Sequence, residues 1–148
     1  MKISTKGRYG LRFMIDLALH QDRGQIVAEE IAKRQDISSK YIHVLATDLR
    51  NAGLIRTVRG PNGGYELARQ PSAISALDVL AALEGKCVPV ECVRDASVCV
   101  RAGRCVAREA WCEVASAVDT VLASFTLEQL SNRQRVFNQL EEPLMYHI

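Results

Sequence analysis

Residues 37–67, ISSKYIHVLATDLRNAGLIRTVRGPNGGYEL, decide the fold of this 148-residue chain. Ser38 is a favourable N-cap residue, because its hydroxyl can accept a hydrogen bond from a free amide in the first helical turn. Apolar residues then recur at helical spacing as far as Leu49, and Gly53 suits the left-handed position that ends many helices. These signals predict a helix in the first part of the segment.

A β-hairpin is predicted to follow this helix. Residues 54–59 (LIRTVR) are β-prone, residues 60–64 (GPNGG) are turn residues, and residues 65–67 (YEL) can return as a second strand. Upstream, residues 27–35 indicate a short helix joined to the next by only a few residues, as in a helix-turn-helix. We therefore expect a mainly α fold with a small β-hairpin wing, namely a winged helix-turn-helix domain plus a long dimerisation helix.

The polar residues of this motif suit DNA binding. Side chains off the apolar stripe of the helix are short polar or basic groups of the kind that reach base edges in a major groove. They are Ser39, Lys40, His43, Arg50 and Asn51. Arg59 lies at the base of the turn and could enter a minor groove, while Gly60, Pro61 and Gly63 leave little bulk between the backbone and a phosphate. A solvated basic face, or a winged domain that binds protein, is the alternative interpretation.

Charge is unevenly distributed along the chain. Residues 1–70 contain twelve Lys/Arg against seven Asp/Glu, a net charge of +5, whereas residues 71–148 contain seven against ten, a net charge of −3. This asymmetry favours a polyanionic partner for the first half. No apolar run approaches the roughly 20 residues of a membrane span, and the N-terminus lacks a signal-peptide apolar region, so we expect a cytoplasmic protein.

The chain divides into segments by pattern. They are a DNA-binding domain (1–84), a cysteine-bearing loop (85–104), a dimerisation helix with a short C-terminal helix (105–130), and a tail without an assigned structure (131–148). Apolar residues from Trp111 to Phe125 recur in steps of three and four, close to a coiled-coil seam. This seam predicts a homodimer; the alternative is that the helix folds back on the first helix of its own chain.

Five cysteines fall within one 26-residue window: Cys87, Cys92, Cys99, Cys105 and Cys112. In a cytosolic chain such crowding indicates a metal or redox site more than a disulfide framework. The C-x6-C-x5-C spacing of Cys92, Cys99 and Cys105 matches neither zinc fingers nor the common ferredoxin motifs. A flexible loop could still fold three thiolates around a cluster, with Cys87, Glu109 or a partner-chain residue as fourth ligand. Free thiols are the alternative.

Several segments resemble the IscR-like family of winged helix-turn-helix iron-sulfur transcription regulators. They are MKISTKGRYGLRFMIDLAL (1–19), GLIRTVRGPNGGYEL (53–67), ISALDVLAALEG (74–85), CVAREAW (105–111) and FTLEQL (125–130). The resemblance implies a homodimer that controls transcription at a palindromic operator in double-stranded DNA. It also implies that Cys92, Cys99 and Cys105 ligate an iron-sulfur cluster, [2Fe-2S] in many members, and that Tyr41, Arg59 and Pro61 belong to the DNA-reading helix and wing.

The chain departs from the family pattern at three positions. Arg108 stands where the cluster-assembly regulators have a histidine ligand, and Arg8 stands where nitric-oxide-sensing relatives have an acidic ligand. His43 replaces a glutamate that tunes operator choice in many assembly regulators. From the resemblance as a whole, the leading hypothesis is a regulator controlled by an iron-sulfur cluster. The alternative is a clusterless regulator of cysteine or sulfur metabolism that responds through its thiols or through a partner protein.

Enzymatic activity is not expected from this sequence. Its histidines, His20, His43 and His147, are scattered and are not paired with a catalytic-looking cysteine motif. The glycines of residues 60–64 join two strands and do not open a helix, which excludes a phosphate-binding loop.

Overall fold

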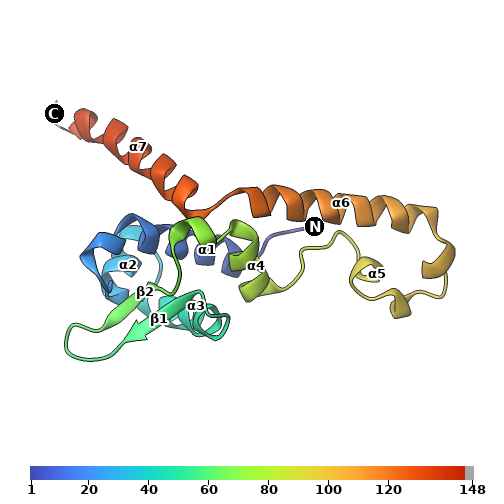
Figure 1. The fold of residues 1–148 in the computed structure, drawn as a ribbon, viewed down its shortest axis with the longest axis horizontal. Helices are drawn as coiled ribbons and strands as arrows, with labels where there is room; N and C mark the ends of the chain where they lie inside the picture. The colour runs from blue at the N-terminus through green and yellow to red at the C-terminus, as the bar shows by residue number, and fades with distance from the viewer. Residues whose placement is uncertain (146–148) are drawn as a thin grey trace.

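The computed structural model of the protein describes residues 1–145 (Figure 1). Residues 146–148, the end of the segment assigned to the tail, lie outside the described residues, and so does His147. The helices and strands follow in the order α1 (Thr5–Leu19), α2 (Ala28–Gln35), α3 (Ser39–Asn51), β1 (Ile55–Val58), β2 (Gly64–Leu67), α4 (Ala76–Glu84), α5 (Glu91–Arg94), α6 (Val106–Ser124) and α7 (Leu127–Met145). The expected mainly helical fold with a small hairpin is confirmed.

Helices α2 and α3 form the predicted helix-turn-helix, and α3 has the predicted ends. The Ser38 hydroxyl accepts a hydrogen bond of 3.1 Å from the backbone N–H of Tyr41. Ile37 and Ile42, which flank this cap, are both buried and form the hydrophobic staple. Gly53 has a φ of 72°, the left-handed conformation that ends the helix.

The wing is an antiparallel hairpin in which Ile55 pairs with Leu67 and Val58 with Gly64. Its second strand is also fixed to the segment before α2, because Tyr65 and Ile26 exchange two backbone hydrogen bonds of 2.8 Å. A Cβ atom at Gly64 would lie 2.2 Å from the carbonyl oxygen of Ile26. The close approach of these two backbones therefore requires glycine at this position.

Helix α1 crosses α4 at short range. A Cβ atom at Gly10 would lie 2.0 Å from Cδ1 of Leu83, so the two helices meet where α1 lacks a side chain. At the start of α1, the Glu84 carboxylate accepts hydrogen bonds from the backbone N–H and the hydroxyl of Ser4, at 3.0 and 2.6 Å. Because Ser4 is the N-cap of α1, the end of α4 holds the start of α1 in place.

Helix α2 is attached to α1 by a buried carboxylate. Asp16 accepts hydrogen bonds from Nε and Nη2 of Arg34, at 2.9 and 2.7 Å, and from the side-chain amide of Gln35 at 3.0 Å. The hydrogen bond to Asp16 raises the pKa of Arg34 further above its ordinary value. This bidentate ion pair fixes the first helix of the helix-turn-helix to the core.

The second half of the chain is elongated. Helix α6 extends away from the winged domain with α5 alongside it, and α7 leaves in another direction (Figure 1). Helix α6 packs on α4, and α7 packs on α1. In the described part of the chain, no helix is both long and apolar enough to cross a membrane.

One expectation for this half is wrong, and a second is met in part. The helix after Thr126 is not short, because α7 continues to Met145. It contacts α1, while its residues 132–141 are exposed. The apolar face that α6 leaves open overlaps the predicted seam in part. Val118 and Leu122 of the seam line it together with Val114 and Val121, whereas Ala115 of the seam is buried.

Candidate nucleic-acid interface

The exposed face of α3 carries three of the side chains predicted to bind DNA. Lys40, His43 and Arg50 are exposed, and neither Lys40 nor Arg50 forms an ion pair with any described residue. Ser39 is half-buried, and its hydroxyl donates to the Glu29 carboxylate at 3.3 Å. Two cations are thus available to phosphates on this face, while Ser39 has a partner within the protein.

Tyr41 packs against another helix, unlike the exposed Lys40 and His43 beside it on α3. It is half-buried, and its ring meets that of Tyr9 edge-on, with the centroids 6.1 Å apart. The guanidinium of Arg12 lies 5.4 Å from the centroid of the Tyr9 ring. Tyr41 therefore joins α3 to α1 beside a cation, and its own hydroxyl has no hydrogen-bond partner among residues 1–145.

The wing presents Arg59 at its base and Pro61 at its exposed turn. Gly60 has a φ of 119°, and a Cβ atom at Gly63 would lie 2.4 Å from the carbonyl oxygen of Val58, so the turn needs both glycines. A cavity of about 310 Å³ between α3 and the wing is lined in part by His43, Arg59, Gly60 and Gly63. The fold thus brings these four predicted residues to one cavity, which Ser39, Lys40, Tyr41, Arg50 and Pro61 do not line.

Tyr65 belongs to this face and was missed by the sequence analysis. Its hydroxyl lies 2.5 Å from Nδ1 of His43, behind the exposed surface of α3. Burial raises the pKa of the Tyr65 phenol, Arg50 opposes that shift and Glu29 adds to it. The signal in the sequence was only the inward position of an aromatic residue in the second strand, which does not reveal the histidine partner.

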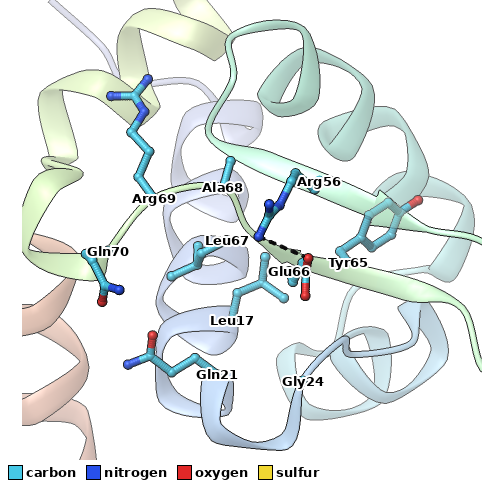
Figure 2. Close-up of a pocket in the computed structure, with 10 residues that line it drawn as sticks. All are labelled: Leu17, Gln21, Gly24, Arg56, Tyr65, Glu66, Leu67, Ala68, Arg69 and Gln70. Carbon is cyan, nitrogen blue, oxygen red and sulfur yellow. Dashed lines mark ion pairs between the residues drawn. The ribbon is translucent and has the colours of Figure 1, made fainter.

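A second cavity, of about 400 Å³, lies between the end of α1 and the hairpin (Figure 2). Figure 2 shows Arg56 and Glu66 at this cavity, joined by an ion pair of 3.2 Å. None of the residues predicted to bind DNA lines it. The candidate interface is therefore the face of α3 and the wing, and not this cavity.

The cysteine loop contains more regular structure than expected, since it includes α5 and two short 3₁₀ turns. Cys92 lies in α5, Cys99 follows the first turn, and Cys105 is the N-cap residue of α6. All five cysteines, including Cys87 and Cys112, are half-buried free thiols.

These ligand candidates do not meet. Among the described residues, no three histidine, cysteine or carboxylate side chains converge to form a metal site. Glu109, a predicted fourth ligand, is exposed, and Arg108 donates from Nε to the carbonyl oxygen of Cys92 at 2.8 Å. In this arrangement a guanidinium, and not a shared ligand set, connects α6 to α5 beside the cysteines.

Known proteins similar to this chain are transcriptional regulators. The chain is 43% identical over 132 residues to the HTH-type transcriptional regulator CymR of Bacillus subtilis, covering 89% of this chain and 91% of CymR. It is 34% identical over 138 residues to IscR of Photorhabdus laumondii, covering 93% of this chain and 84% of that protein.

Solved structures agree with these sequence matches. The structure of CymR, described as the global cysteine regulator of B. subtilis, matches with a TM-score of 0.74 over 90% of this chain and 98% of CymR. IscR of T. potens, 36% identical, also has a TM-score of 0.74, over 90% of this chain and 88% of that protein. Residues 3–133 match the family model Rrf2, described as an iron-dependent transcriptional regulator. The resemblance to IscR-like proteins is confirmed, and the chain belongs to the Rrf2 family of winged-helix transcriptional regulators.

Proposed function

We propose that this protein is a cytoplasmic, homodimeric transcription regulator that binds palindromic operator DNA through α3 and the wing. The observation that carries the proposal is the common face on which His43 and Arg59 line one cavity, with Lys40 and Arg50 exposed on the same helix as His43. A recognition helix and an adjacent arginine on a thin loop suit a major groove and a neighbouring minor groove, respectively.

The dimer is proposed to form through α6. One face of this helix has a hollow of about 350 Å³ lined entirely by apolar residues, namely Val114, Ala117, Val118, Val121 and Leu122. Val121 is 55% exposed in the single chain. A twofold partner presenting the same face would bury this row and would place two winged domains on one palindrome.

We further propose that control does not need a cluster, and that the protein regulates cysteine or sulfur metabolism through its thiols or a partner protein. The scattered positions of Cys92, Cys99 and Cys105 support this proposal. So does the 43% identity to CymR, which is described as a global cysteine regulator. Iron-sulfur sensing is the second candidate, favoured by the similarity to IscR and by the placement of three cysteines in one loop.

Anaerobic purification followed by iron and sulfide analysis separates the two candidates. The clusterless proposal expects a colourless protein after reconstitution, whose DNA binding changes with thiol oxidation or partner addition. The response to oxidation should be lost in Cys92→Ala and kept in Cys112→Ala, the matched cysteine inside α6. A brown protein with stoichiometric iron and sulfide, both lost in Cys92→Ala, would contradict it and establish the cluster.

DNA binding itself is tested on genomic duplex fragments at low salt, with sedimentation at several protein concentrations as the measure of dimer formation. We expect a dimer that Val121→Glu converts to a monomer with weaker operator binding. A wild-type protein that is monomeric and does not bind duplex DNA would refute the proposal.

A further inference from the structure

His43 is held in one orientation by the wing. Its Nδ1 lies 2.5 Å from the Tyr65 hydroxyl, and the two ring centroids are 5.9 Å apart. Tyr65 is itself fixed, because its ring packs edge-on against Phe13 at 5.8 Å and its backbone is bonded to Ile26. Rotation of the His43 ring away from this position would leave a buried hydroxyl without its partner.

The direction of this hydrogen bond follows from the chemistry of the two groups. The residue Tyr65 is 9% exposed, and His43 is the one hydrogen-bond partner of its hydroxyl among the described residues. A phenol is a stronger acid than a neutral imidazole N–H, and an imidazole nitrogen is a stronger base than a phenol oxygen. Burial raises the pKa of Tyr65, which keeps the proton on the phenol. The hydroxyl therefore donates and Nδ1 accepts.

This bond decides which nitrogen of His43 carries the proton. A neutral imidazole has one N–H, so a ring that accepts at Nδ1 is protonated at Nε2. His20 provides the opposite case in the same chain, since its Nδ1 lies 2.8 Å from the backbone carbonyl oxygen of Asp16. A carbonyl can only accept, so His20 must carry its proton on Nδ1.

We propose that Tyr65 is a positioning residue that makes His43 present an N–H donor at Nε2 to the major groove, where it favours a guanine over a cytosine. The inference deepens the proposed function and rests on it. Guanine offers two acceptors on this edge, O6 and N7, whereas cytosine offers the N4 amino donor. His43 is exposed and lines the cavity between α3 and the wing, which is the side on which DNA would bind.

The tautomer is tested without DNA. ¹⁵N NMR of the folded wild-type protein, above the pH at which imidazole titrates, distinguishes a protonated ring nitrogen from an unprotonated one. His43→Gln assigns the signals. We expect His43 protonated at Nε2 and His20 at Nδ1, and Tyr65→Phe should change the His43 signals alone. A His43 ring protonated at Nδ1 in the wild type would overturn the proposal, and this result does not depend on whether the protein binds DNA.

The specificity is tested by selecting sites from a random duplex library. Wild-type protein should prefer guanine over cytosine at one position of each half-site by roughly fivefold, the size of one net hydrogen bond. Tyr65→Phe and His43→Ala should each remove that preference, while Tyr9→Phe, whose hydroxyl has no partner among the described residues, should keep it. An unchanged preference in a folded His43→Ala protein would overturn the inference. Failure of the wild type to bind any duplex would overturn the proposed function instead.

Discussion

Replacement of Arg34 by methionine tests whether the buried ion pair holds the helix-turn-helix to the core. The Asp16 side chain is 1% exposed and that of Arg34 is 28% exposed, with N–O distances of 2.7 and 2.9 Å. In Arg34→Met the carboxylate would stay buried without its cation, keeping the Gln35 amide at 3.0 Å as a donor. Removing one partner of a buried pair costs about 3–5 kcal/mol, and the partial exposure of Arg34 and the remaining amide reduce the expected loss to about 2–4 kcal/mol.

Arg23→Met is the matched control. Arg23 and Arg34 both contact the Glu30 carboxylate, at 3.3 and 3.2 Å, so both variants lose one contact to the same residue. The Arg23–Glu30 pair has side-chain exposures of 57% and 42%, and such surface pairs contribute about 0–1 kcal/mol. The difference between the two variants therefore isolates the pairing with Asp16.

The assay is urea denaturation followed by circular dichroism, at one fixed protein concentration because a dimer links stability to concentration. We expect Arg34→Met to lower the free energy of unfolding by at least 1 kcal/mol more than Arg23→Met does. Equal losses in the two variants would show that the Asp16–Arg34 pair adds no more to stability than a solvent-exposed pair does.

Three further predictions concern the wing, and the control for one of them, Gly103→Ala, lies in the cysteine loop. Arg59→Ala should weaken binding about equally to all duplexes and reduce the salt slope of the binding constant by about 1, measured by fluorescence anisotropy across salt concentrations. Gly64→Ala should cost about 1–3 kcal/mol of unfolding free energy, because its Cβ would displace Ile26 and break two backbone hydrogen bonds. Gly103→Ala, with nothing within 4 Å of the added atom, should change that energy by less than about 0.5 kcal/mol in the same denaturation assay. Because burial raises the pKa of Tyr65 in the folded state, its contribution to stability is complete below its ordinary value of about 10 and is lost as pH rises through the folded value. Absorbance titration should accordingly show one phenol that titrates above its ordinary pKa, and this signal should be absent in Tyr65→Phe.

Local signals in the sequence were enough to predict the helix-turn-helix and the wing. Three signals act over only a few residues: the Ser38 cap, the left-handed Gly53 and the turn of residues 60–64. The physical effect of each can therefore be predicted from the residues next to it in the sequence. The capping box of Ser75 with Asp78 is present for the same reason. The strength of these local preferences made the fold predictable.

Contacts between distant segments could not be predicted in this way. The His43–Tyr65 bond joins residues 22 positions apart, and the Asp16–Arg34 pair joins residues 18 positions apart. The contact of α7 with α1 also joins distant segments, and no helical period reveals it. For the cysteines, the order in the chain suggested a common ligand set, but α5 and the 3₁₀ turns hold them in separate places.

The connections of the cysteine loop determine how a change there can reach the DNA-binding face. The loop begins after Glu84, the last residue of α4, whose carboxylate caps α1 through Ser4, and it ends at Cys105, the N-cap residue of α6. Helix α1 then contacts α3 through the ion pair of Lys6 with Asp48. A rearrangement of the loop therefore has two routes, one through α4 and α1 within the chain and one through α6 to the proposed twofold partner. Because the Leu83 side chain of α4 packs directly against the backbone of α1 at Gly10, a shift of α4 would press on α1.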